Sequence, residues 1–361
     1  MDSAPKVLSD VNSSWLTRVL HEAGALDSHI NVKSIQLEPM GAGVGMMSSM
    51  SRILMDYDQE GASSPESLVI KLPAENETNR AVAEQFYLYL KEVRFYEELA
   101  PLTSAASPKI YASSLDENQN FLLLMEDATD YRMGNQVIGA TLEECEICVA
   151  ELAKLHASFW GKLEAVDWLP HIANSENATN MAHGAEMGWD QLIEYFGDQV
   201  PFSINERRDA YLANIDRLQN LLDQAPTTLV HGDFRMDNML FGQRVEHNPL
   251  IIVDYQGPLK GKGIQDFAYF LCHSTQIEVR RQHEQALVQS YVDGLIKGGV
   301  RGYDFPQAWE DYRVGVLYSW CVATVTAGTM DPDNDRGYAW MAKMVERNGV
   351  AIEDLDCLGL L

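Results

Sequence analysis

Two neighbouring stretches of the sequence decide the fold: LVHGDFRMDNMLF at residues 229–241 and LIIVDYQ at residues 250–256. In the first, an apolar run leads into a loop that holds Asp233, and Asn238 follows five positions later. The runs MLF and LIIVD predict the two strands of a hairpin, and the second strand ends on Asp254. Local structure alone would therefore bring two carboxylates and one amide to the same place.

This set of side chains is the one that phosphoryl transfer requires. One carboxylate orients the attacking hydroxyl and accepts its proton, while an Asn and a second carboxylate hold the Mg²⁺ ions that neutralise the phosphates. Oxygen ligands of this kind suit a hard ion such as Mg²⁺. An isolated Asp-turn-Asn segment before a strand is commonly only a hairpin or an Asx turn, so the hypothesis depends on the rest of the chain.

The rest of the chain supplies further features in the order that a kinase needs. A glycine-rich turn, GAGVG, lies at residues 41–45, and the strand-like run LVIKL at residues 68–72 contains Lys71. One helix with a charged face and an apolar face is predicted for residues 79–99, followed by a strand pair at 109–113 and 121–125. From residue 141 helical patterns dominate, broken by residues 161–203 and by the loop and hairpin at 228–256.

The sequence resembles the aminoglycoside phosphotransferase and choline kinase superfamily, which has the protein-kinase-like fold. Within it, the chain is most similar to the ecdysteroid-kinase-like (CHK kinase-like) group and its bacterial relatives. The resemblance spans most of the chain, and four stretches carry it: HGDFRMDN at 231–238, VDYQ at 253–256, GIQDFAYFL at 263–271 and LAKLHASFW at 152–160.

The resemblance implies an α+β, bilobal protein-kinase-like fold. We expect residues 1–127 to form the nucleotide-binding lobe, a small antiparallel sheet with one helix that includes the hinge strand. Residues 128–361 are expected to form a larger, mainly helical lobe with the catalytic loop and the acceptor site.

The resemblance also assigns roles at the catalytic end. Asp233 corresponds to the catalytic residue that accepts the hydroxyl proton, and Asn238 and Asp254 correspond to the Mg²⁺ ligands. Where protein kinases have Asp-Phe-Gly, this chain has Asp-Tyr-Gln at 254–256, which suggests that it lacks their flipping Phe switch. His231 corresponds to a histidine that braces the catalytic loop, and Asp266 to an acid that ties this loop to the next helix. His156 is expected to be a core histidine with satisfied hydrogen bonds and not a base, so all three are expected to be structural.

A nucleotide site is implied in the first lobe. Lys71 corresponds to the lysine that contacts the α- and β-phosphates of ATP, although a lysine at a strand end also commonly extends to water. Its partner is expected to be Glu92, with Glu84 as the alternative. The simpler interpretation of Glu92 is a residue on a solvated helix face.

Further nucleotide contacts follow from the same resemblance. The glycines would bring backbone N–H groups close to phosphate oxygens, with Ser48 adding a hydroxyl, although a plain flexible loop explains the turn equally well. The strand FLLLM would lead into a hinge that holds adenine. The residues expected to make these contacts are Gly41, Gly43, Gly45, Ser48, Met125, Glu126 and Ala128.

The composition limits the partners. With 53 Asp and Glu against 27 Lys and Arg, the net charge is −26, which argues against nucleic acid and anionic membranes as partners. The N-terminus shows no signal peptide and no apolar run spans a bilayer, so we expect a cytoplasmic protein. The five cysteines do not predict disulfides, and the lone CxxC of Cys145 and Cys148 is not expected to bind metal.

The acceptor is the least defined partner. We expect a small-molecule alcohol, and the group resemblance favours a lipophilic or steroid-like one. Aromatic residues at 161–203 and at Trp309, Tyr318, Trp320 and Trp340 would suit such a molecule, although aromatic residues at helical spacing are more often core. The alternatives are an aminoglycoside or a choline-like amino alcohol, and, in another class, a pseudokinase that binds nucleotide without turnover.

Overall fold

The computed structural model describes residues 4–40, 47–59, 61, 64–329 and 335–361. The chain divides into two compact units. The first unit contains Met1–Pro101 and Ser107–Asp130, and the second contains Leu102–Ala106 and Tyr131–Leu361.

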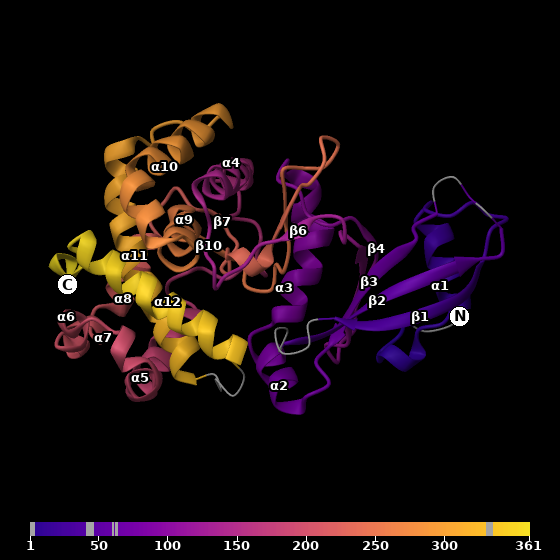
Figure 1. The fold of residues 1–361 in the computed structure, drawn as a ribbon, viewed down its shortest axis with the longest axis horizontal. Helices are drawn as coiled ribbons and strands as arrows, with labels where there is room; N and C mark the ends of the chain where they lie inside the picture. Colours follow the sequence, from indigo (N-terminus) through magenta and orange to yellow (C-terminus); the bar gives the residue numbers. More distant parts are fainter. Residues whose placement is uncertain (1–3, 41–46, 60, 62–63, 330–334) are drawn as a thin grey trace. The chain divides into compact units, whose positions relative to one another are not determined.

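The first unit is built on an antiparallel sheet (Figure 1). Its strands in the described part of the chain follow the order β1-β2-β3-β5-β4. They are β1 (Val32–Met40), β2 (Ser48–Tyr57), β3 (Ser67–Pro73), β4 (Ile110–Leu115) and β5 (Phe121–Glu126). The residues of the central strand β3 are almost all apolar, which suits its position because both of its faces are buried.

One face of this sheet forms the hydrophobic core of the unit. Leu68, Ile70 and Leu72 of β3 alternate onto that face and pack in one cluster with Trp15 and Leu16. The last two residues belong to helix α1 (Ser13–Glu22), whose N-terminus is capped by the side chain of Asn12. This helix was not among the predicted elements.

The single helix predicted for residues 79–99 is wrong. The structure has α2 (Glu77–Gln85), α3 (Leu88–Arg94) and a π-helical segment, η2 (Phe95–Leu99). Tyr87 separates α2 from α3 because its φ of 54° is left-handed and interrupts the helical hydrogen bonding. The apolar spacing of the sequence continues through this break, so periodicity alone does not reveal it.

The second unit is mainly helical (Figure 1). It also contains short strands that pair as β7 with β10 and as β6-β8-β9. The helices are α4 (Leu142–Phe159), α5 (Glu176–Phe196), α6 (Phe202–Asn205), α7 (Arg208–Leu212), α8 (Ile215–Leu222), α9 (Ile264–Tyr269), α10 (Ile277–Lys297), α11 (Phe305–Thr329) and α12 (Asp335–Asp354). The strands are β6 (Arg132–Met133), β7 (Thr228–Val230), β8 (Met239–Phe241), β9 (Leu250–Ile252) and β10 (Leu259–Gly261).

The interpretation of residues 161–203 as a break in the helical pattern is wrong from residue 176 onward, where α5 begins, although residues 161–175 contain no helix. Glycines lower helix propensity, and this helix contains two, Gly184 and Gly188. Both lie against α11: a Cβ on Gly188 would come within 2.9 Å of the Thr324 carbonyl oxygen. The missing side chains let the two helices approach closely, so tertiary packing favours glycine where local propensity does not.

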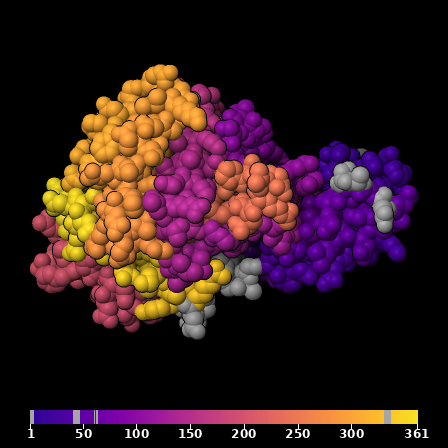
Figure 2. Space-filling model, turned by 45° about the horizontal axis from the view of Figure 1, so that its top comes forward, coloured from indigo at the N-terminus to yellow at the C-terminus, as the bar shows by residue number. Residues whose placement is uncertain are grey.

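The hairpin predicted around residues 239–254 is present. Strands β8 and β9 pair antiparallel, with Met239 opposite Ile252. Figure 2 shows the residues that join them as a salmon-orange group on the surface of the second unit. Within the described residues, no helix is both long and apolar enough to cross a bilayer.

Candidate active site

A tight loop between β7 and β8 carries the catalytic candidate Asp233. Gly232 has a φ of 84°, and a Cβ there would lie 2.2 Å from the carbonyl oxygen of Gly257. Only glycine fits both conditions. The short helix η5 (Met236–Asn238) then returns the chain to β8. The side chain of Asp233 is therefore presented from a closely defined backbone.

Helix α9 anchors this loop through Asp266. Its carboxylate accepts hydrogen bonds from the backbone N–H groups of His231, at 2.6 Å, and Gly232, at 3.0 Å. His156 Nε2 lies 3.2 Å from the same carboxylate, and His156 Nδ1 lies 2.7 Å from the Tyr291 hydroxyl. The side chain of His231 bridges to the Val253 carbonyl oxygen at 3.1 Å. These buried residues brace the loop.

The carboxylate of Asp233 is held by three donors and still reaches solvent. Asn238 Nδ2 donates to Oδ2 at 2.9 Å, Arg235 Nε donates to Oδ2 at 3.1 Å, and the Tyr269 hydroxyl donates to Oδ1 at 3.0 Å. The side chain remains 35% exposed. An oriented yet accessible carboxylate is what a group that accepts a hydroxyl proton needs.

Asn238 and Asp254 are joined by the hairpin. The amide nitrogen of Asn238 points at Asp233, so its amide oxygen is directed elsewhere. The backbone N–H of Val253 donates to the Asn238 carbonyl oxygen at 3.1 Å, which brings the next residue, Asp254, beside it. Asp254 has a left-handed φ of 68°, a conformation that is uncommon for a residue other than glycine and is one of the strained conformations that cluster at functional sites.

These residues fit a Mg²⁺ ion. An amide oxygen and a carboxylate are hard ligands, and Mg²⁺ commonly takes only one or two carboxylates together with substrate phosphates and water. Among the described residues there is no group of three or more His, Cys, Asp and Glu side chains that would bind a metal without substrate. Because Asn238 and Asp254 supply only two oxygen ligands, they suit a Mg²⁺ ion whose other ligands are water and substrate phosphates.

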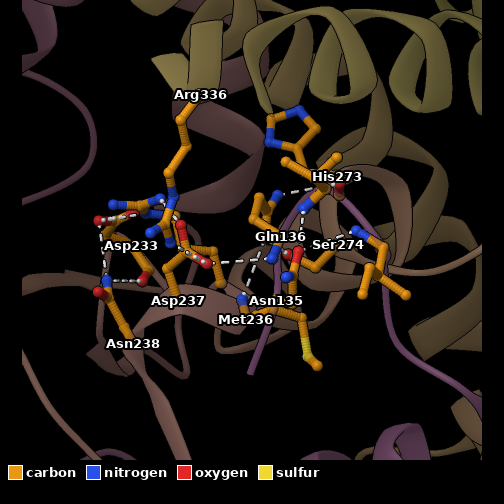
Figure 3. A network of polar contacts seen from close by, with 12 residues as sticks. Asn135, Gln136, Asp233, Met236, Asp237, Asn238, His273, Ser274 and Arg336 are labelled. Carbon is orange, nitrogen blue, oxygen red and sulfur yellow. Dashed lines mark hydrogen bonds and ion pairs between the residues drawn. The ribbon is translucent and has the colours of Figure 1, made fainter. Parts of the chain in front are cut away.

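A buried amide supports the loop from the other side (Figure 3). Gln136 is 1% exposed, and its Oε1 accepts from the Met236 backbone N–H at 3.1 Å and from Ser274 Oγ at 2.8 Å. Its backbone N–H donates to Asp237 Oδ1 at 3.0 Å, and its Nε2 donates to the His273 carbonyl oxygen at 3.1 Å. One glutamine thus fixes two consecutive residues of the catalytic loop.

Helix α12 completes this support. Arg347 is buried and donates to the carbonyl oxygens of Gln136, at 2.7 Å, Val137, at 2.8 Å, and His273, at 3.1 Å. Asn348 Oδ1 lies 3.1 Å from His273 Nε2. Burial lowers the pKa of His273 to about 4, so this ring is neutral at physiological pH.

In the first unit, Lys71 pairs with Glu92 and not with Glu84. Lys71 Nζ donates to Glu92 Oε1 at 2.7 Å, and both side chains are buried. Glu84 instead pairs with Arg80 on the surface of α2. A buried carboxylate at this distance fixes the lysine ammonium in one position.

The register of the sheet puts further predicted residues on the face of Lys71. Met50 lies opposite Lys71 and Ser48 opposite Pro73, while Met125 lies opposite Val69. Opposite residues, and residues two apart on a strand, share a face. The side chains of Ser48, Lys71 and Met125 therefore point to the same side of the sheet, away from the core described above.

The hinge residues lie at the end of β5, which ends at Glu126, and just after it. Asp127 anchors this end, because Arg52 Nε and Ser67 Oγ each donate to it at 2.7 Å. Burial alone would raise the pKa of Asp127, but hydrogen bonds from Thr129, Ser67 and Arg52 hold it below its usual value. Ala128 is half-buried beside it. Gly41, Gly43 and Gly45 lie outside the described residues.

The sequence of the catalytic loop matches a known family. Residues 42–299, well over half of the chain, match the family model described as "Ecdysteroid kinase-like family". The chain belongs to the ecdysteroid kinase-like family. Membership makes it a small-molecule kinase, as predicted, and confirms the resemblance to the ecdysteroid-kinase-like group.

Solved structures share the fold of this ecdysteroid kinase-like chain. A choline kinase from Cryptosporidium parvum is 10% identical with a TM-score of 0.56, over 96% of this chain and 98% of that one. The GDP complex of a wild-type aminoglycoside 2'-phosphotransferase-IIIa is 11% identical with a TM-score of 0.55, over 94% and 98%. A Plasmodium vivax ethanolamine kinase is 11% identical with a TM-score of 0.51, over 98% and 92%.

These likenesses confirm the predicted protein-kinase-like fold class of the ecdysteroid kinase-like chain. No curated protein matches the chain. The individual roles of the site residues, and the assignment of nucleotide binding to residues 1–127, stay predictions.

Several residues of this ecdysteroid kinase-like site were not found from the sequence. Arg235 and Asp237 lie inside the HGDFRMDN motif, and Tyr269 lies inside GIQDFAYFL. Their positions in these motifs could have indicated that they belong to the site. Gln136 contacts Met236 across 100 positions, and no local pattern marks it.

Of the aromatic candidates, Trp189, Trp320 and Tyr318 are buried in the core. Trp340 is half-buried, and the guanidinium of Arg235 lies 5.1 Å from the centre of its ring. Cys145 and Cys148 are buried as well, and burial raises the pKa of the Cys145 thiol to about 12.

Proposed function

We propose that this chain is an ATP- and Mg²⁺-dependent kinase that transfers the γ-phosphate of ATP to a hydroxyl of a small-molecule alcohol. The observation that carries the proposal is the carboxylate of Asp233, which three side chains orient while it stays accessible. A residue with only a structural role would have no reason to remain exposed among three donors.

The reaction follows from these residues. Asp233 orients the acceptor hydroxyl, and the hydroxyl oxygen forms a bond to the γ-phosphorus while the bond from that phosphorus to the bridging oxygen breaks. The hydroxyl proton passes to Asp233, and ADP leaves with the electron pair of the broken bond. Asn238 and Asp254 would hold Mg²⁺, which when bound neutralises charge on the phosphate oxygens.

Lys71 has a separate role in the proposal. Its ammonium would contact the α- and β-phosphates, and Glu92 would keep it from rotating away. Ser48 and Met125, on the same face of the sheet, would contact phosphate and adenine, and Glu126 and Ala128 would contribute backbone groups in the hinge. We propose the same phosphate-binding role for the glycines at 41, 43 and 45.

The acceptor is proposed to be a lipophilic alcohol. The family to which the chain belongs carries the name of a steroid kinase, and the half-buried indole of Trp340 lies close to the Arg235–Asp233 pair. An aromatic ring in this position suits the apolar part of an acceptor.

The decisive experiment compares wild type with Asp233→Asn, which keeps the size of the side chain. Transfer from γ-labelled ATP to an alcohol panel, read by mass spectrometry, should fall by about 10³-fold or more, an order of magnitude set by losing a positioned base and an orienting group together. ATP binding should change by less than about threefold, because Asp233 faces the acceptor and not the nucleotide in this mechanism. Retained transfer would contradict the role of Asp233, and tight ATP binding without transfer by wild type would indicate a pseudokinase.

The metal assignment has its own test. Asp254→Ala should shift the Mg²⁺ titration of ATP binding to higher concentration, because one of two oxygen ligands is lost. Glu246→Ala, which removes an exposed carboxylate between β8 and β9, is the control. An identical titration for wild type and Asp254→Ala would remove Asp254 from the metal site.

A further inference from the structure

Two guanidinium groups lie along the catalytic loop. Arg235 Nε donates to Asp233 Oδ2 at 3.1 Å, and its NH1 donates to Asp237 Oδ2 at 3.3 Å. On the other side of Asp237, Arg336 NH2 lies 3.7 Å from Oδ1. Figure 3 shows the side chain of Arg336 reaching from α12 toward Asp233 and Asp237. Asp237 is thus shared between two arginines beside the catalytic carboxylate.

The two arginines differ in their exposure to solvent and in their hydrogen bonding. Arg235 is 14% exposed, and its two carboxylate partners raise its pKa above the usual value although burial opposes this. Arg336 is 53% exposed, and among the described residues it makes the ion pair at 3.7 Å but no hydrogen bond. This distance is longer than a hydrogen bond. The donors of Arg336 are therefore available to another group.

Trp340 lies on the same helix as Arg336 and close to Arg235. It follows Arg336 by four positions in α12, so the two side chains emerge on one face of the helix. Its ring is 5.1 Å from the Arg235 guanidinium. A molecule whose hydroxyl reaches Asp233 therefore has an indole and a half-exposed guanidinium close to its remaining atoms.

We infer that the acceptor alcohol also carries an anionic group, a carboxylate or a phosphate, that pairs with Arg336. This inference rests on the proposed function and specifies its substrate class. A guanidinium matches both anions with two parallel hydrogen bonds. The same charge disfavours an ammonium group at this position, because like charges brought together oppose binding. A choline-like or aminoglycoside acceptor is thus the less suitable partner for this side of the site.

Binding of matched compounds tests the inference without requiring turnover. The probes share one hydroxylated skeleton, a 3-hydroxysteroid in one series and a cyclohexanol in the other. In each series the skeleton ends in a carboxylate, a phosphate, a carboxamide or an ammonium group. Titration calorimetry on the full chain should show at least one anionic member binding about tenfold or more tightly than its amide and ammonium counterparts, as expected for a charge-assisted pair. Comparing carboxylate with phosphate identifies the anion.

Variants then assign the preference to Arg336. Arg336→Gln should weaken binding of the anionic member about tenfold and change binding of the amide less than about twofold, while Arg336→Lys should keep part of the preference. Arg244→Gln, at an exposed arginine between β8 and β9, should change nothing. Equal binding of anionic and neutral members, absence of anion binding in both series, or a preference that survives Arg336→Gln would overturn the inference.

Transfer assays separate this inference from the proposed function. Phosphate transfer to the neutral amide with no preference for the anionic members would contradict the inference alone. Binding of an anionic member through Arg336 without transfer to any member would contradict the proposed function alone.

Discussion

Lys71 and Glu92 form an ion pair that is almost completely removed from water. The Nζ–Oε1 distance is 2.7 Å, and the side chains are 4% and 1% exposed. The pair joins the central strand β3 to helix α3 within the first unit. Charges held this way are costly to separate, because each would otherwise need water that is not present.

Glu92→Gln should therefore destabilise the protein as well as impair catalysis. Loss of one partner leaves a buried charge without compensation, which costs about 3–5 kcal/mol in the free energy of unfolding. Urea unfolding measures this, and steady-state kinetics should show a raised KM for ATP. Glu84→Gln breaks the partly exposed pair with Arg80 and should cost less than about 1 kcal/mol. Equal effects of the two variants on the free energy of unfolding would contradict the expected cost of leaving Lys71 buried without a partner.

Tyr89 offers a second test in the same helix. Its hydroxyl donates to the Met47 carbonyl oxygen at 2.8 Å and accepts from the Ala74 N–H at 3.0 Å. Tyr89→Phe removes both bonds and leaves a buried N–H without a partner, so unfolding should become easier by about 1–3 kcal/mol. Because Met47 closely follows the glycines of the GAGVG run in sequence, the KM for ATP should rise while kcat changes little. Tyr87→Phe, at an exposed tyrosine, is the control, and a fall in kcat with an unchanged KM would contradict this role.

Tyr269 should act on the catalytic carboxylate itself. Its hydroxyl donates to Asp233 Oδ1 at 3.0 Å, opposite the donors that hold Oδ2. In Tyr269→Phe, Asp233 can rotate out of line with the acceptor, and kcat should fall about tenfold, as for other small losses of orientation. The KM for ATP should not change. Tyr195→Phe, at an exposed tyrosine on α5, should leave kcat unaffected.

His273 predicts a pH dependence of stability. Burial lowers its pKa from 6.5 to about 4, so between these values the unfolded chain binds a proton that the folded chain does not. Stability rises with pH wherever the unfolded state binds more protons, and acidification from pH 7 to about pH 5 should therefore destabilise the fold. The contribution of this ring approaches about 1.4 kcal/mol per pH unit in the middle of that interval.

The variant His273→Gln tests this pH dependence, because a glutamine side chain does not bind a proton in this pH range. In His273→Gln, the unfolding free energy should fall less steeply over the same acid range than in wild type, as measured by urea unfolding at each pH. The exposed His29→Gln should retain the wild-type slope. Parallel curves for wild type and His273→Gln would show that the ring is not held neutral.

The predictable part of the site is the part made by local sequence. The β8–β9 hairpin follows from two short apolar runs, and it alone brings Asn238 near Asp254. The choice of Glu92 over Glu84 was open from the sequence, because both lie within the predicted helix. Burial decides between them, since Glu92 faces β3 and Glu84 faces Arg80 at the surface.

The unpredicted part depends on contacts between distant residues. Helix α5 contains glycines that argue against a helix locally and are explained only by α11 packed against them. The break at Tyr87 is a single backbone conformation that does not disturb the apolar spacing. Gln136 supports Met236 and Asp237 from about 100 positions away, so its role exists only once the chain has folded.

Arg347 binds the carbonyl oxygens of Gln136 and His273, and this contact shows that the segment matched by the family model is shorter than the segment that must fold together. The segment by which the family is recognised ends at residue 299, yet three carbonyl groups beneath the catalytic loop are bound by an arginine from α12, beyond that limit. The unit of recognition and the unit of folding are therefore different lengths of chain. A fragment limited to residues 42–299 would keep Lys71, Asp233, Asn238 and Asp254. It would lose Arg347, which binds the backbone carbonyl groups that support the catalytic loop.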